Sequence, residues 1–341
     1  MLRLVDIGHK LNLLKLAQFA VHASKFCSGG PDQSVTFLQA CVVKIEEMKL
    51  GRAALEPILF IRMHIAQIKI ESGLAAGSPT GSALIQEAKV MVEKGKEELA
   101  KLSDVDPSVS ATTHYVSSLY FRAVSDYAEF YRSSLMYLSF VSSDSLPDDF
   151  KRTMAIDISL SALLGEHVYT FGQLLQHPIA SSLDGTPHRW LHEMLHVFND
   201  GDLHKYDELC VKYGAQLNSQ PALVQHERRL REKITLMSLI EMVSSLPAES
   251  RRIRLVDIST RTKLNADGVE MLLMKALSLH LIEGSIDQVE GVVEVSWVQS
   301  RILTPTQVQG LKERLDQWIS KVQSASMTLE QETIGVVEAS A

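Results

Sequence analysis

The sequence predicts a mainly α-helical protein: a helical-repeat α-solenoid of the tetratricopeptide type, then a winged helix-turn-helix, then a C-terminal helix. Three observations support this order. Helical periodicity recurs from residue 1 to about 247. A helix–helix–hairpin pattern occupies 248–303. Apolar residues at steps of three and four then form a stripe within 304–324.

The first predicted domain, 1–247, consists of amphipathic helices separated by short turns. Segments such as "GGPD" (29–32) and "SDVDPS" (103–108) interrupt the pattern with residues that favour turns. Between such segments apolar residues recur on one helical face, as in Ile58, Ile61, Ile65 and Ile68. A steady succession of helices of about 12–20 residues predicts stacked antiparallel pairs. The defining residue pattern of the tetratricopeptide repeat is absent, so the prediction concerns architecture only.

The character of the sequence changes after Pro247. "RRIRLVDISTRTKL" predicts a short extended segment and then a short helix. In the next predicted helix, "NADGVEMLLMKALSLHLI", Asn265 is the expected N-cap. "EGSIDQVEGVVEVSW" (283–297) alternates apolar and polar residues after a turn that contains Gly291, which predicts a hairpin. Helix, helix and hairpin in this order indicate a winged helix.

The last predicted helix begins at Thr304 as N-cap, with Pro305 in the first turn. Its apolar stripe has the three-and-four spacing of a coiled-coil seam and consists of Val308, Leu311, Leu315, Trp318 and Val322. Two interpretations remain: the seam packs on its own winged helix, or it reaches helices of partner proteins. Its place after the closed hairpin favours the partner interpretation. The polar, acidic segment 325–341 is expected to be disordered.

Composition excludes several classes of protein. The 34 basic and 41 acidic residues give a net charge of −7, so no diffuse attraction to nucleic acid or anionic membranes is expected. Three cysteines, none in a C-x-x-C pair, exclude a disulfide framework and suit a reducing compartment. Polar residues interrupt the first 26 positions, which favours a core helix over a signal peptide. No run reaches the roughly 20 apolar residues of a membrane span. We expect a soluble intracellular protein.

One short motif suggests catalysis. Within "RWLHEMLHVFNDGD" (189–202), His192, Glu193 and His196 match the H-E-x-x-H pattern of zinc proteases, with Asp202 near the position of a third ligand. However, Asn199 replaces the glycine that turns the chain in the longer protease pattern, and no strand pattern precedes the helix. The polar flank is typical of a solvated helix face. We therefore predict no metal here and keep a zinc metalloprotease as the remote alternative.

Charge also argues against DNA binding by the winged helix. The predicted recognition helix, 266–280, carries Asp267 and Glu270 against Lys275. The wing has no basic residue and four acidic ones, Glu283, Asp287, Glu290 and Glu294. Phosphate contacts need clustered lysine and arginine. Phosphate-binding loops and nucleophile elbows are also absent from the sequence. We expect no nucleic-acid partner, no catalytic residue, no cofactor and no small-molecule substrate.

Four segments carry a resemblance to a known family: "LSALLGEHVYTFGQLLQHPI" (160–179), "WLHEMLHVFNDGD" (190–202), "LLMKALSLHLIEGSIDQVEGVVEVSWVQSRIL" (272–303) and "LKERLDQW" (311–318). Together with the predicted architecture, they resemble the PCI family. Its members are scaffold subunits of the proteasome lid, the COP9 signalosome and the translation initiation factor three complex. The amino-acid sequence of the winged-helix segment resembles proteasome lid members most, and membership of one of the other two complexes is the alternative.

The resemblance implies a non-catalytic scaffold in the cytoplasm and nucleus that supports lid assembly and ATP-dependent degradation of ubiquitinated proteins. It implies PCI subunits of the lid as partners, joined through their winged helices, and a bundle of terminal helices. It also implies that a further helical stretch precedes the first residue in the family. Finally, it implies that other members of the family do not share His192, Glu193 and His196 together in the matching helix.

The predicted partner-binding residues fall into two groups. In the hairpin, backbone groups are expected to pair with a neighbour's sheet while the acidic charges limit indiscriminate pairing. These hairpin positions are Ile286, Val292, Val293, Val295 and Trp297. The second group is the seam of the C-terminal helix, with Val308, Leu311, Leu315, Trp318 and Val322.

Overall fold

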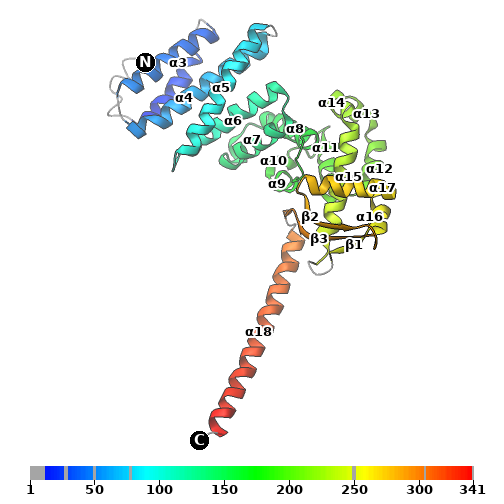
Figure 1. Ribbon diagram of the computed structural model, residues 1–341. Helices are drawn as coiled ribbons and strands as arrows, with labels where there is room; N and C mark the ends of the chain where they lie inside the picture. Colours follow the sequence, from blue (N-terminus) through cyan, green and yellow to red (C-terminus); the bar gives the residue numbers. More distant parts are fainter. Residues whose placement is uncertain are drawn as a thin grey trace. The chain divides into compact units, whose positions relative to one another are not determined.

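The computed structural model describes residues 12–26, 30–48, 51–76, 79–247, 251–302 and 305–339. The predicted start of a helix within residues 1–11 and the predicted N-cap Thr304 lie outside these ranges. The chain divides into two compact units, one ending at Val298 and one beginning at Gln299. Helices dominate both units, as the sequence predicts (Figure 1).

The amino-terminal part of the first unit is a succession of helices (Figure 1): α2 (Leu13–Ser24), α3 (Pro31–Glu47), η2 (Gly51–Ala54), α4 (Leu55–Ala76), α5 (Pro79–Lys101), α6 (Pro107–Val124), α7 (Tyr127–Phe140), η3 (Ser143–Ser145) and α8 (Asp148–Leu164). Helix α4 packs against α2, α3, α5 and α6. Its run Pro57–Ile61 is buried at every position, because neighbours cover α4 on several sides and not on the single predicted face.

Shorter helices follow: α9 (Gly172–Gln176), α10 (Pro178–Ser181), α11 (Arg189–Asp200), α12 (Leu203–Lys212), α13 (Gly214–Asn218), α14 (Pro221–Gln225) and α15 (Glu227–Ser245). Helices α14 and α15 are divided at His226, whose backbone is not helical (φ −109°, ψ 19°). Aspartate caps begin several helices. Asp106, Asp126 and Asp202 accept hydrogen bonds from the free amides of α6, α7 and α12.

The winged helix consists of β1 (Arg252–Arg254), α16 (Leu255–Thr262), α17 (Ala266–Ser278), β2 (Ile282–Asp287) and β3 (Val292–Val298). Asn265 caps α17 as predicted, accepting from the amide of Gly268 at 3.0 Å. The sheet is antiparallel with three strands in the order β1-β3-β2, one more than the predicted hairpin. Because β1 pairs with β3, the hairpin is joined to the start of the domain.

Two hydrophobic cores lie within the first unit. One is built from α2–α6, between Leu16 and Tyr120. The other extends from Phe130 on α7 to Val295 on β3. The predicted domain boundary at residue 247 therefore marks a change of element type, while the core continues across it. Hydrophobic side chains of α15 and of the winged helix are members of one cluster, so we expect the two to fold together.

A buried lysine joins α15 to the end of α8. Lys233 is 7% exposed, and its Nζ atom donates to the carbonyl oxygens of Ala162 (2.7 Å), Leu163 (3.2 Å) and Gly165 (2.9 Å). The last carbonyls of a helix lack partners inside the helix and carry its negative dipole end. The Nζ atom of Lys233 satisfies two such groups, Ala162 and Leu163, and also the carbonyl of the C-cap residue Gly165. Phe171 presents its ring face to the same nitrogen, 5.2 Å from the ring centroid.

A glycine sets how closely the α11–α12 turn approaches α15. Gly201 ends α11 with φ +63°, a left-handed conformation that suits glycine. A Cβ atom at this position would lie 2.7 Å from the Cα and backbone nitrogen of Ser238. The turn therefore touches the backbone of α15 directly.

The second unit contains the helix α18 (Pro305–Ala339). The predicted end at Ser324 is wrong, because the structure continues the helix to Ala339. No proline follows Pro305, and each of the two glycines in this helix, Gly310 and Gly335, costs only about 1 kcal/mol. The hydroxyls of Ser324 and Thr328 bond to carbonyls four residues earlier and leave the helical backbone intact. Among the described residues, no helix has the length and apolar character needed to cross a membrane.

We expect Lys233→Met to lower the free energy of unfolding by about 2 kcal/mol, because it leaves two carbonyls of α8 and the carbonyl of Gly165 without their donor. An adjoining cavity of about 270 Å³ admits water, which limits the loss. Lys275→Met is the matched control, since Lys275 lines the same cavity but pairs with Glu232 at the surface. Urea denaturation of the full chain measures both. An equal loss in the two variants would contradict the role given to Lys233.

Lys233 also predicts a pH dependence. Burial lowers the pKa of Lys233 to about 7 in the folded chain, whereas an unfolded lysine has a pKa of about 10.4. At pH values between these two pKa values, the unfolded chain holds a proton on Lys233 that the folded chain lacks. The contribution of Lys233 to the free energy of unfolding therefore rises with pH in this range. We expect the stability difference between the parent and Lys233→Met to grow from pH 7 to pH 9 and to be flat below pH 7. A difference that stays constant up to pH 9 would refute this.

Gly201→Ala should destabilise the chain by at least about 2 kcal/mol, because it adds left-handed strain and a clash with α15. Gly214→Ala is the control. A Cβ there has no neighbour within 4 Å, and Gly214 lies in α13, so alanine should be neutral or slightly stabilising. Thermal unfolding followed by circular dichroism distinguishes the two. Similar melting temperatures for the two variants would show that the turn has room to move.

Candidate protein-interaction surfaces

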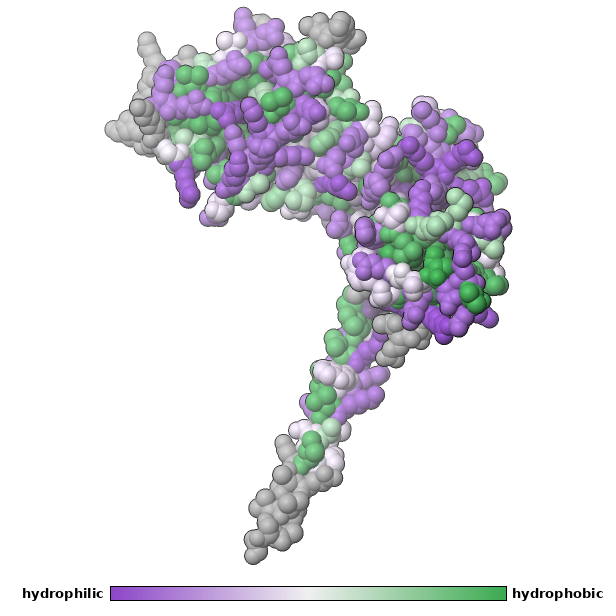
Figure 2. Space-filling view, in the orientation of Figure 1, coloured by the Kyte–Doolittle hydropathy of each residue, from purple (hydrophilic) through white to green (hydrophobic). Residues whose placement is uncertain are grey.

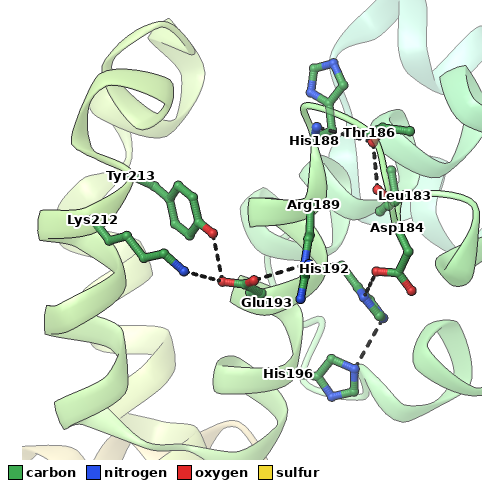
Figure 3. Close-up of polar contacts among 10 residues, drawn as sticks. All are labelled: Leu183, Asp184, Thr186, His188, Arg189, His192, Glu193, His196, Lys212 and Tyr213. Carbon is green, nitrogen blue, oxygen red and sulfur yellow. Dashed lines mark hydrogen bonds and ion pairs between the residues drawn. The ribbon is translucent and has the colours of Figure 1, made fainter.

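The two histidines of the H-E-x-x-H motif lie on α11 and face each other (Figure 3). Their Nε2 atoms are 3.2 Å apart, so one imidazole donates to the other. The Nδ1 atom of His192 lies 3.0 Å from the Asp184 carboxylate. Burial and the nearby His192 lower the pKa of His196. Both rings are therefore engaged in a local chain of hydrogen bonds.

The glutamate of the motif points to other partners (Figure 3). Glu193 accepts from the Tyr213 hydroxyl at 2.9 Å and from Lys212 Nζ at 3.2 Å, and it pairs with Arg189 at 3.2 Å. Burial acts to raise the pKa of Glu193, but the hydrogen bonds from Tyr213 and Lys212 and the two positive charges outweigh it and lower the pKa. Glu193 thus links α11 to the end of α12 as a structural carboxylate.

A third metal ligand is not brought to the histidines. Asp202 instead caps α12, accepting from the amides of His204 (3.0 Å) and Lys205 (3.2 Å). A catalytic zinc needs three protein ligands. Within the described ranges, His, Cys, Asp and Glu side chains form no group of three that could hold a metal ion. The contacts of Glu193 and Asp202 support the interpretation of the motif as a chance match.

The basic residues of the winged helix are largely neutralised by acidic neighbours. Lys263 lies 3.2 Å from Asp207, and Arg254 lies 2.9 Å from Asp257. Arg252 pairs with Glu290, and Lys275 pairs with Glu232. The four acidic residues of the wing are exposed. The wing itself therefore presents acidic side chains and no cation to a phosphate.

The structure corrects part of the predicted hairpin surface. Val293 is fully buried and Val295 is 3% exposed, so both side chains belong to the protein's own core. Ile286 and Val292 are partly buried, and Ile286 packs against this core. Of the five predicted residues, Trp297 alone is an exposed large apolar side chain, at 44%. Strand alternation pointed Val293 and Val295 to one face, and that face covers the protein's interior.

The strand that offers a free edge is also different. Val292, Val293, Val295 and Trp297 belong to β3, which lies between β1 and β2. The long free edge of the sheet is β2, Ile282–Asp287. Its register shifts between Glu283 and Gly284, a bulge that interrupts the edge. Any pairing with a neighbour's strand would therefore use the β2 edge.

The seam of α18 is exposed along its whole length. Val308, Leu311, Leu315, Trp318 and Val322 are 44–65% exposed, and Ile319, Met327 and Leu329 extend the apolar set. Figure 2 shows hydrophobic residues along one side of α18 and hydrophilic residues along the other. A single helix gains little stability from such a stripe unless another surface covers it.

Sequence reasoning missed a second group of exposed apolar residues. Met271 and Met274 on α17 are 67% and 56% exposed, and Val289 at the hairpin tip is 97% exposed. Helical spacing of α17 indicates this: with Val269, Leu272 and Leu273 facing the core, Met271 and Met274 fall on the other side.

The fold and these surfaces define a class of protein. A helical solenoid that shares its core with an acidic winged helix is the architecture of a PCI-domain subunit. Family models agree: PSD13 N-terminal repeats match residues 4–195, and the PCI domain matches residues 208–297. Similarity to curated proteins extends over nearly the whole chain.

Homolog B of 26S proteasome non-ATPase regulatory subunit 13 from Arabidopsis thaliana is 44% identical over 336 residues, 98% of this chain and 84% of that protein. The subunit of this name from Dictyostelium discoideum is 31% identical over 97% of this chain and 82% of its own length. The probable 26S proteasome regulatory subunit rpn9 of Schizosaccharomyces pombe is 33% identical over 94% of this chain and 78% of its own length. The chain belongs to the family of 26S proteasome non-ATPase regulatory subunit 13.

From the contacts of Glu193 and Asp202 we expect the purified full chain to retain no stoichiometric zinc after dialysis. Inductively coupled plasma mass spectrometry after incubation with zinc measures this, with His192→Ala and the exposed His204→Ala compared side by side. The three proteins should hold the same background amount of metal. One zinc per chain, lost in His192→Ala but kept in His204→Ala, would restore the metal-site interpretation.

Proposed function

We propose that this protein is a non-catalytic scaffold subunit of the proteasome regulatory particle lid, supporting assembly and ATP-dependent degradation of ubiquitinated proteins. Two findings support the proposal. The chain belongs to a family named for a non-ATPase regulatory subunit of the 26S proteasome. The motif that most resembles a catalytic site has its glutamate and its aspartate committed to structural contacts. The alternatives, a scaffold of the COP9 signalosome or of translation initiation factor three, are not favoured, because these close relatives are proteasome subunits.

The observation that carries the proposal is the exposed seam of α18. Five apolar side chains at heptad spacing are exposed on a helix 35 residues long. Each contributes roughly 1.5–3 kcal/mol when another surface buries it fully. Because the seam residues are exposed in the isolated chain, this free energy is available for assembly. We propose helices of other lid subunits as the covering surface.

The free edge of β2 supports a second contact, with neighbouring PCI subunits. Backbone groups there are open to a neighbour's strand, while Glu283 and Asp287 limit indiscriminate pairing. We propose that the winged helix uses this edge together with Trp297. A lid subunit of this kind acts in the cytoplasm and the nucleus, and we propose both as its location.

The test is the double variant Leu311→Asp/Leu315→Asp of the full chain. We expect its melting temperature to match the parent, because both side chains are already exposed. We expect its incorporation into the lid, followed by co-purification with a tagged lid subunit, to fall at least about tenfold, since two buried leucines are worth more than 1.4 kcal/mol.

The control variant is Gln309→Asp/Ser320→Asp, which adds the same two charges on the side of α18 away from the seam. It should assemble like the parent. A large loss of thermal stability in Leu311→Asp/Leu315→Asp, with incorporation intact, would show that the seam serves the chain's own fold. Normal incorporation of both variants would exclude α18 from assembly.

A further inference from the structure

A groove of about 860 Å³ lies between the helical part of the second core and the winged helix. One wall is a face of α15 with Arg228, Arg231, Glu232 and Thr235. The last three follow Arg228 by three, four and seven residues, which places all four on one side of the helix. The opposite wall is α17 from Gly268 to Ser278. Ten helical steps at 1.5 Å give this wall a length of about 15 Å. The groove is therefore long and flanked by two helices.

The α17 wall of this groove is apolar and exposed. Met271 and Met274 line it at 67% and 56% exposure, with Leu264 and Leu272 beside them. Figure 2 shows hydrophobic residues among hydrophilic ones on the winged-helix part of the molecule. Methionine side chains are unbranched and adapt to different apolar partners, as in other helix-binding surfaces. The same helix in a DNA-binding winged helix would carry polar and basic residues instead.

Charge at the groove is opposite in sign to that of the chain. Four cationic side chains line it, Arg228, Arg231, Lys263 and Lys275, against two carboxylates, Asp207 and Glu232. Both carboxylates are already paired: Asp207 lies 3.2 Å from Lys263 and 3.6 Å from Arg231, and Glu232 pairs with Lys275. Arg228 makes no ion pair with any described residue. The groove has a local excess of two positive charges on a chain of net charge −7.

We propose that this groove binds an acidic amphipathic helix of a partner protein, with apolar side chains against Met271 and Met274 and carboxylates toward Arg228 and Arg231. The dimensions support a helix, because the walls are two helices and the groove spans about three turns. The charge supports an acidic ligand, because its carboxylates would pair with Arg228, which has no ion pair among the described residues, and would offset the local excess of positive charge near Arg231. None of the residues that line the groove belongs to α18 or to β2, so its test is independent of the proposed assembly contacts.

Two labelled synthetic peptides of 14 residues test the proposal by fluorescence anisotropy with the full chain. Both carry leucines at helical positions i, i+3, i+4 and i+7, which form one apolar face. At the charged positions outside this face, one peptide has glutamate and the other has lysine. We expect saturable binding of the glutamate peptide, at least tenfold tighter than the lysine peptide, weakened by added salt. Circular dichroism should show the bound glutamate peptide becoming helical.

Variants locate the binding. Met271→Glu/Met274→Glu should lower the affinity for the glutamate peptide at least tenfold. Met271→Leu/Met274→Leu should keep this affinity within about twofold of the parent. Arg228→Glu should weaken it several-fold. Arg229→Glu is the matched control, because Arg229 is adjacent in sequence but lines a different cavity and pairs with Glu166. Leu311→Asp/Leu315→Asp should bind like the parent.

Several outcomes would overturn the proposal. These are the absence of saturable binding, equal binding of the two peptides, or unchanged affinity in Met271→Glu/Met274→Glu. Self-association of the chain that this double variant abolishes would assign the groove to a second copy instead. A loss of affinity in Arg229→Glu equal to that in Arg228→Glu would place the peptide elsewhere on α15.

Discussion

The ammonium of Lys233 is the interaction on which the second core depends most directly. It takes three carbonyls from the end of α8 and holds them against α15, the helix that the winged helix also packs on. Charged groups are rarely buried without a partner, because desolvation costs several kcal/mol. Here the helix terminus supplies the partner. Since α15 contacts α8, α11, α12, α16 and β3, an error in its position would propagate to each of them.

Around this helix, polar groups serve structure more than chemistry. Glu193 ties α11 to α12 and α13, Asp202 caps α12, and Gly201 lets the intervening turn touch α15. Of these residues, Glu193 belongs to the H-E-x-x-H motif, and Asp202 is the one near its third-ligand position. Their contacts are explained by helix packing. The apolar exposure lies elsewhere, on α18 and α17, where nothing within the respective unit covers it. Contiguous exposed apolar faces of this kind are typical of surfaces that bind other proteins.

Much of the fold was predictable because it depends on local periodicity. The solenoid, the N-cap Asn265, the hairpin turn at Gly291 and the seam of α18 all follow from residues near one another in sequence. The chain's place in the PCI family was likewise predictable from four segments. The length of α18 was underestimated, because a polar composition does not end a helix that lacks a proline or a capping turn.

The sequence by itself determined the element types, the seam of α18 and the acidic character of the wing, because each depends on spacing or charge along the chain. The tertiary structure alone decided what covers each apolar face. It buried Val293 and Val295, placed β3 in the middle of the sheet, and left Met271 and Met274 exposed beside a basic groove. Burial depends on residues brought together from distant positions, such as Ile253 opposite Val293. Period and composition carry no information about those pairings.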